Sequence, residues 1–195
     1  MQQPILKLSH TDYFALECET DQRHEYLAGE VFAMAGGSES HALISSNAIA
    51  ALSLSLRDRP CRVYGSDMRL YIHSIDKFCY PDVTVLCEEG KRSMHYIESP
   101  VLLIETLSPN TESYDRGLKF EHYRQIDSLR YYLLLTQDRP HAELFTRASE
   151  TAWVLSECSG MGGELLLSQW NIRLPLQEIY RLVDFSQSEG AIQPA

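Results

Sequence analysis

Apolar residues in this chain are grouped into short runs of strand length, separated by Gly, Pro and polar turns. A tight hairpin is expected at 26–34, where Gly29 supplies the backbone freedom that the turn needs. The pattern therefore predicts a protein built around β-sheet. The other runs that read as strands are 61–72, 81–86, 100–107, 131–136 and 142–147, with two further strands around Trp153 and Leu165.

Helical spacing appears in four other stretches. In the longest, at 38–57, Ile44, Ala48 and Leu52 recur every four residues, and the helix ends before Pro60. No repeat or linker divides the strands from the helices, which indicates one mixed unit. The shorter predicted helices are 11–20, with Thr11 as its N-cap, 111–126 and 175–183.

Length and composition set the limits on function. With 195 residues, 44% of them hydrophobic, we expect one globular domain over 1–185 and a flexible tail at 186–195. The five cysteines are odd in number and contain no C-x-x-C pair, so they signal neither a disulfide framework nor a zinc knuckle and favour a reducing, cytoplasmic location. We expect no membrane span and no signal peptide.

The formal net charge of −10 weighs against a protein that holds nucleic acid through a broad basic surface. Such binding depends on Lys and Arg side chains that displace counterions from the phosphates. A local basic patch remains compatible with this charge. Its candidate residues are Arg57, Arg59, Arg62, Arg69, Lys91, Arg92, Arg116, Lys119 and Arg124.

Two acidic residues stand at the ends of consecutive predicted strands. Asp82 opens the run at 81–86, and Glu105 lies near the far end of the run at 100–107. If these strands pair antiparallel, both carboxylates meet at one edge of the sheet, where they suit Mg²⁺ or Mn²⁺ and phosphodiester chemistry. The ordinary alternative is two unrelated acids at strand ends. Against it, a carboxylate that follows three aliphatic residues needs a partner or a metal.

Lys119 lies in the predicted helix that follows Glu105. Asp115 and Tyr123 are four residues before and after it, so all three share one helix face. An ammonium on that face would stabilise negative charge at a reacting phosphate. The alternative is an exposed Asp115–Lys119 ion pair worth a few tenths of a kcal/mol.

Three further polar residues are accessory candidates. Glu25 precedes the hairpin and can complete a carboxylate cluster, or it is a surface acid. His41, in the first turn of the long helix, can act as a ligand, proton carrier or phosphate contact, or it caps the helix. Asp67 has the same ambiguity and a weaker case.

Taken in order, these residues resemble the Uma-type restriction endonucleases of the PD-(D/E)XK superfamily over roughly residues 10–147. The resemblance implies an α/β (α+β) restriction-endonuclease-like fold, a mixed β-sheet flanked by helices, and divalent-metal hydrolysis of DNA. By position, it makes Asp82 and Glu105 the metal ligands, Glu25 an accessory carboxylate and Lys119 the catalytic lysine. The matching motifs are Glu-Tyr-Leu-x-Gly-Glu at 25–30, His41, Ser66-Asp67, Pro81-Asp82-Val83, Glu105-x-x-Ser-Pro-x-Thr, Asp115, Lys119 and Tyr123.

The chain departs from the superfamily pattern at one important position. The lysine usually lies two residues after the acidic ligand, where this chain has Leu107. In the resembled family a helix lysine at the position of Lys119 is thought to replace it.

We therefore expect a metal-dependent phosphodiester hydrolase, most directly a DNA endonuclease. Because cleavage of two strands favours two sites, a homodimer is expected. Two alternatives remain open: a binding or regulatory protein on a nuclease scaffold, and a hydrolase of another phosphorylated or nucleotide substrate.

Overall fold

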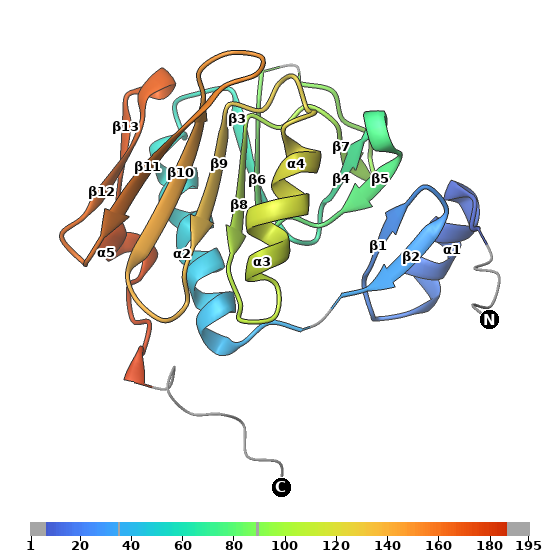
Figure 1. The fold of residues 1–195 in the computed structure, drawn as a ribbon, viewed down its shortest axis with the longest axis horizontal. Coiled ribbons are helices and arrows are strands. Elements are labelled where there is room, and N and C mark those ends of the chain that lie inside the picture. Colours follow the sequence, from blue (N-terminus) through green and yellow to red (C-terminus); the bar gives the residue numbers. More distant parts are fainter. Residues whose placement is uncertain (1–6, 35, 89, 187–195) are drawn as a thin grey trace, which may run out of the picture.

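The computed structural model describes residues 7–34, 36–88 and 90–186, which form two main sheets with helices packed against them (Figure 1). The helices are α1 (His10–Glu19), α2 (Glu39–Ser55), α3 (Glu112–Tyr114), α4 (Phe120–Tyr123) and α5 (Leu176–Ile179). The strands are β1 (His24–Leu27), β2 (Glu30–Ala33), β3 (Cys61–Gly65), β4 (Arg69–Ile72), β5 (Lys77–Cys79), β6 (Val83–Cys87), β7 (Tyr96–Ile97), β8 (Leu102–Thr106), β9 (Tyr131–Leu135), β10 (His141–Arg147), β11 (Trp153–Ser159), β12 (Glu164–Leu167) and β13 (Ile172–Pro175).

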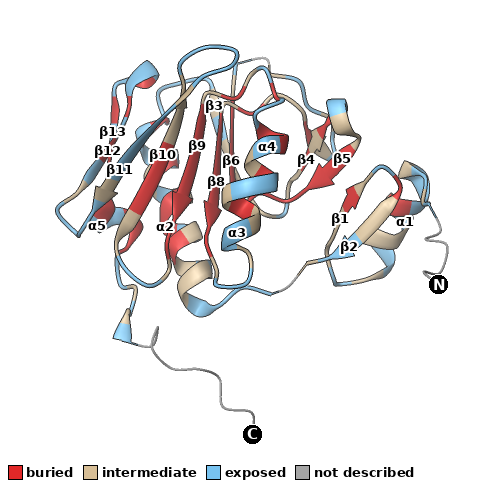
Figure 2. Cartoon of the chain, viewed as in Figure 1, coloured by how far each residue is buried: buried red, intermediate tan, exposed pale blue. Residues whose placement is uncertain are grey.

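The central sheet has six strands in the order β11-β10-β9-β8-β6-β3. Its pairs are antiparallel except for β8 with β9, which run parallel. Strands β8 and β9 are buried along their whole length (Figure 2). The sequences of β9 and of the first three residues of β8 are apolar without interruption, because helices or strands cover each face. The predicted mixed sheet flanked by helices is confirmed.

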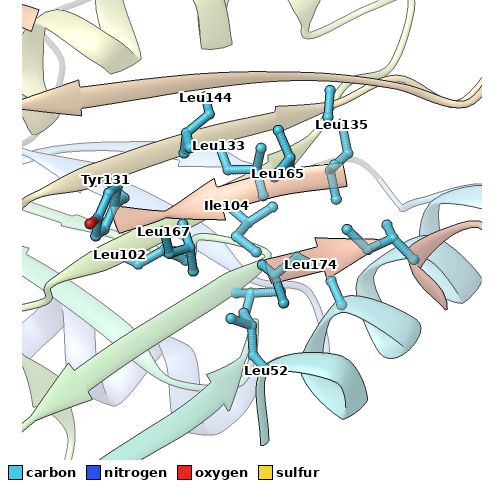
Figure 3. Close-up of a cluster of buried hydrophobic side chains, with 14 of the residues drawn as sticks. Leu52, Leu102, Ile104, Tyr131, Leu133, Leu135, Leu144, Leu165, Leu167 and Leu174 are labelled. Atoms are coloured by element: carbon cyan, nitrogen blue, oxygen red, sulfur yellow. The ribbon is translucent and has the colours of Figure 1, made fainter. Parts of the chain in front are cut away.

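One face of the central sheet packs against α2, α5 and the β12–β13 hairpin. Leu52 of α2, Ile104 of β8, Leu133 of β9 and Leu174 of β13 belong to one buried cluster (Figure 3). Residues 102 and 104 point to this face, so residues 103 and 105 point to the other, since side chains alternate along a strand.

The opposite face packs against the α3–α4 segment and the second sheet. Leu103 and Tyr132 of the central sheet share a buried cluster there with Tyr123 of α4 and Leu70 of β4. The second sheet has the order β2-β1-β5-β4-β7. Because β5 ends at Cys79 and β6 begins at Val83, three residues connect the two sheets beside this face.

The segment between α3 and α4 is a π turn, Asp115–Lys119. Helical backbone therefore continues from 112 to 123, close to the predicted helix at 111–126, but with one widened turn. The Tyr132 hydroxyl donates a hydrogen bond of 2.9 Å to the Asp115 carbonyl oxygen. Such turns are rare and often lie at functional sites.

Some local predictions were wrong. The run at 61–72 is two strands in different sheets, β3 and β4, because the turn after Gly65 redirects the chain. Ser9, not Thr11, caps α1, and its hydroxyl accepts from the Asp12 amide. Strands β5, β7 and β13 were not predicted, and α5 is shorter than the helix expected at 175–183. Apart from residue 186, the predicted tail at 186–195 lies outside the described residues.

The number and spacing of the cysteines gave no sign of a disulfide, but the structure contains one. Cys61 and Cys87 are bonded as a disulfide across β3 and β6, where they face each other in the antiparallel register. Their separation of 26 residues in sequence gives no hint of this pairing. Within the described ranges, none of the helices is both long and apolar enough to cross a membrane.

Candidate active site

Asp82 and Glu105 meet across two neighbouring strands. Strands β6 and β8 are antiparallel with Val83 opposite Ile104, so one further residue along this register sets Asp82 opposite Glu105. Asp82 Oδ2 also accepts a hydrogen bond of 2.7 Å from the Thr106 amide. The antiparallel pairing predicted from the sequence is confirmed, and both carboxylates lie at the same edge of the sheet.

The Glu105 carboxylate is almost completely enclosed, with 3% of the residue exposed. Its Oε1 accepts a hydrogen bond of 2.7 Å from the Tyr123 hydroxyl, and its Oε2 lies 2.8 Å from Lys119 Nζ. Burial raises the pKa of Glu105 to about 8; the Lys119 charge opposes the rise, while the charges of Asp82 and Asp115 add to it. Additional positive charge would therefore stabilise the ionised form.

Lys119 is held as an ammonium between two acids. Its Nζ lies 3.2 Å from Asp115 Oδ1 as well as 2.8 Å from Glu105 Oε2. Burial alone would lower the pKa of Lys119, but the charges of Glu105, Asp115 and Glu25 outweigh burial and raise this pKa well above its ordinary value. The predicted shared face of Asp115, Lys119 and Tyr123 is thus turned inward, so the alternative of an exposed surface ion pair was wrong.

His41 joins the cluster from the N-terminal turn of α2. The Ser38 hydroxyl caps this helix by accepting from the His41 amide, which fixes the start of the helix. His41 Nε2 lies 3.0 Å from Asp82 Oδ2. The hydrogen bond to Asp82 raises the pKa of His41, and burial opposes the rise. His41 is thus both close to the helix cap and a partner of the candidate ligand Asp82.

Glu25 reaches the cluster through two residues that sequence reasoning missed. Lys77 Nζ lies 2.9 Å from Glu25 Oε2 and donates a hydrogen bond of 2.6 Å to the Tyr114 hydroxyl. Tyr114 in turn donates to Glu25 over 3.2 Å. Burial would raise the pKa of Glu25, but the charges of Lys119 and Lys77 lower it. A usable signal was present: Lys77 begins the apolar Lys-Phe-Cys-Tyr run that leads directly to Pro81 and Asp82.

Asp67 is not part of this arrangement. It pairs with Arg23, and 91% of its side chain is exposed. Asp67 lies in the turn from Gly65 to Met68, which connects β3 to β4. The active-site cluster, defined here as Glu25, His41, Lys77, Asp82, Glu105, Asp115, Lys119 and Tyr123, therefore excludes Asp67.

The donors in the active-site cluster fit a divalent cation. Asp82 and Glu105 offer hard carboxylate oxygens from rigid strands, the ligand type that Mg²⁺ and Mn²⁺ prefer. Each carboxylate oxygen can accept two bonds, so the existing contacts with Lys119 and Tyr123 leave lone pairs free for a metal. The raised pKa of Glu105 indicates a site where a cation would relieve the cost of burying charge.

A second cluster of ligand-type residues lies on β10 and β11. His141, Glu143 and Glu157 have atoms within 4.8 Å of one another. Arg116 already pairs with Glu143, so the charge of that carboxylate is neutralised by the protein itself.

The mixed sheet, its flanking helices and the carboxylate–lysine cluster define a nuclease-like protein of the restriction-endonuclease-like class. The chain belongs to the Uma2 family, described as "Putative restriction endonuclease", and the match covers residues 10–177. A crystal structure of "a putative nuclease belonging to DUF820" from Anabaena variabilis has the same fold, with a TM-score of 0.69 and 16% identity over 87% of this chain and 96% of that chain. The resemblance in family and fold is thereby confirmed.

Two relatives from Synechocystis sp. extend the sequence comparison. Both are named as uncharacterized proteins. One is 31% identical over 183 residues, which are 93% of this chain and 96% of the relative. The other is 32% identical over 164 residues, which are 83% of this chain and 93% of the relative. Both match nearly their full length, so the family unit corresponds to most of this chain.

Proposed function

We propose that this protein is a divalent-metal-dependent endonuclease that hydrolyses phosphodiester bonds in DNA. The observation that carries the proposal is the Asp82–Glu105 pair, which meets at one sheet edge with Lys119 Nζ 2.8 Å from Glu105. Membership of the Uma2 family supports nucleic acid as the substrate class. The choice of DNA, of Mg²⁺ or Mn²⁺ as the ion, and of a homodimer as the active form belongs to the proposal.

In this mechanism Asp82 and Glu105 would hold the metal, and the bound ion would supply Lewis acidity toward the phosphodiester. The Lys119 ammonium would stabilise the negative charge that grows on the phosphate in the transition state. His41 and the Thr106 amide keep Asp82 oriented, and Tyr123 does the same for Glu105.

A binding protein on a nuclease scaffold is the second candidate. It is favoured by one feature of the site: Lys119 already compensates the buried Glu105, so the carboxylate is satisfied without an ion. In that case the protein would bind DNA without metal-dependent turnover.

The test is a cleavage assay with Mg²⁺ or Mn²⁺ on duplex DNA, single-stranded DNA, RNA and nucleotides. The wild type should cut DNA, and Glu105→Gln should not. Glu178→Gln, at an exposed acid outside both ligand clusters, is the control and should retain activity. Turnover of nucleotides alone would replace the DNA proposal, and failure to cut any substrate would favour the binding protein.

A further inference from the structure

Three arginines gather just beyond the C-terminal end of α4. Arg124 follows α4, Arg130 precedes β9 and Arg147 ends β10, and together they line a cavity of about 670 Å³. The remaining lining residues are Gln125, Asp127, Ala148, Ser149 and Glu150. We call this the arginine pocket.

What distinguishes these arginines is that they lie together in one pocket of an acidic protein. Within the described part of the chain, none of the three forms an ion pair, whereas Arg23, Arg69 and Arg116 pair with carboxylates. Burial and the neighbouring charge of Arg130 lower the pKa of Arg147, while the charge of Asp127 opposes this shift only in part, so the two guanidinium groups repel each other. An anion in the pocket would relieve that repulsion.

The guanidinium groups are held by the backbone and by aromatic rings. Arg147 donates through Nε to the Leu129 carbonyl and through Nη2 to the carbonyls of Arg124 and Ile126, at 2.7 to 2.9 Å. Its guanidinium carbon also lies 4.6 Å from the centre of the Trp153 ring. None of these bonds uses Nη1.

The other two arginines are held more loosely. Arg130 donates through Nη1 to the carbonyl oxygens of Asp127 and Leu129, and these two bonds leave its Nη2 for another acceptor. Arg124 is exposed and lies over the Phe120 ring. Forked guanidinium donors that form no ion pair are suited to phosphate oxygens, and the three arginines outnumber the two acids of the pocket, Asp127 and Glu150.

We propose that the arginine pocket binds a backbone phosphate of the nucleic acid, at a distance from the catalytic carboxylates. The inference rests on the proposed function for the identity of the substrate. Arg130 precedes β9, and Leu134 of β9 pairs with Glu105, so the pocket lies roughly 13 Å along the sheet from the site. That span corresponds to about four nucleotide steps of one strand. A strand anchored in the pocket has the length to reach the active-site cluster.

The test compares DNA binding by two charge-matched double variants. Arg124→Gln with Arg130→Gln removes two pocket charges but keeps Arg147, whose bonds hold the end of the helix segment. Arg57→Gln with Arg62→Gln removes the same charge from exposed positions outside the pocket. Binding of a short duplex is measured by fluorescence anisotropy in EDTA over a salt series, with the melting temperature as a check on folding.

We expect the pocket variant to bind roughly tenfold more weakly at low salt, with its salt slope smaller by about 1, the value for one phosphate, while the control variant keeps both values. Equal losses in the two variants, or no loss in either, would overturn the inference. A parallel titration with inorganic phosphate shows whether the pocket binds free phosphate or a phosphate of the DNA backbone. If phosphate stabilises the wild type through these arginines but DNA binding is unchanged in the pocket variant, the nucleic-acid assignment is wrong.

The binding measurement needs neither metal nor turnover, so it is independent of catalysis. DNA binding that depends on the pocket, without cleavage by the wild type, would reject the endonuclease proposal and keep this inference. If the pocket variant cleaves DNA and binds it as tightly as the wild type, the endonuclease proposal stands and this inference is rejected.

Discussion

Lys119 Nζ lies 2.8 Å from Glu105 Oε2, although the usual lysine position of the superfamily pattern is occupied by Leu107. The ammonium reaches Glu105 from the helical segment that packs over β8, instead of from β8 itself. Both groups are buried, so they form one coupled unit whose removal can be tested in stability and in turnover.

Substitution of Lys119 should separate these two effects. Lys119→Met leaves the buried Glu105 without its cation and should lower the free energy of unfolding by about 3–5 kcal/mol. Lys119→Met with Glu105→Gln should recover part of that loss, because no uncompensated charge remains. Neither variant should cleave DNA at more than about 1% of the wild-type rate. The measurements are denaturant unfolding and single-turnover cleavage, and near-normal cleavage by Lys119→Met would remove its catalytic role.

Removal of either candidate ligand should abolish metal binding. Calorimetry with Mn²⁺ should detect binding by the wild type and none by Asp82→Asn or Glu105→Gln, and EDTA should stop cleavage by the wild type. Glu157→Gln tests the β10–β11 cluster in the same experiment. If Glu157→Gln loses the ion and Asp82→Asn keeps it, the metal lies at the other cluster.

The affinity for DNA should fall less steeply with salt concentration than it does for proteins that make many phosphate contacts. The net charge of −10 leaves few sites where phosphates can be neutralised, so the slope of log K against log salt should be about −2 to −3. A slope near −10, typical of a protein that makes many phosphate contacts, would contradict a local contact.

Acid should weaken the packing of α1 against the second sheet through Asp76. Its carboxylate lies 2.7 Å from His10 Nε2 and accepts 2.9 Å from the Tyr71 hydroxyl. Burial would raise the pKa of Asp76, but the hydrogen bonds from His10 and Tyr71 lower it. The folded pKa is thus below the unfolded value of about 3.9, so the stabilisation is present above that pH and is lost as pH falls through the folded pKa.

The corresponding variant is Asp76→Asn, which keeps a residue tolerant of the left-handed backbone at φ 51°. Above pH 5 it should be less stable than the wild type, and the difference should shrink toward pH 3. Asp138→Asn, an exposed acid paired with Arg139, is the control and should show little pH-dependent difference. Urea unfolding at a series of pH values measures both, and a constant difference for Asp76→Asn would refute the assignment.

Much of the site was predictable because it depends on local pattern plus one assumption about pairing. The apolar runs before Glu105 and after Asp82 mark both strands, and a single antiparallel pairing brings the acids together. Helical spacing likewise places Asp115, Lys119 and Tyr123 on one face. These features involve residues within about 25 positions of one another.

Lys77 and Asp67 show what local pattern could not decide. The apolar run that starts at Lys77 could mark a strand, but not that this strand borders the site, and Asp67 lies in the exposed turn between β3 and β4. Which of them enters the site depends on how the second sheet packs against the first. The Cys61–Cys87 disulfide is of the same kind, because it follows from the register of β3 and β6.

The π turn at Asp115–Lys119 makes the site sensitive to chain length as well as to residue identity. One residue advances an α-helix by about 100°, so deletion of a single residue within this turn would rotate one half of the segment against the other by that angle. Asp115 would then be rotated away from the face that Lys119 and Tyr123 share, so Lys119 could no longer contact both Asp115 and Glu105, even though every side chain of the active-site cluster outside the deletion were retained. Working members of the family should therefore tolerate insertions and deletions in the neighbouring loops more readily than in this one turn.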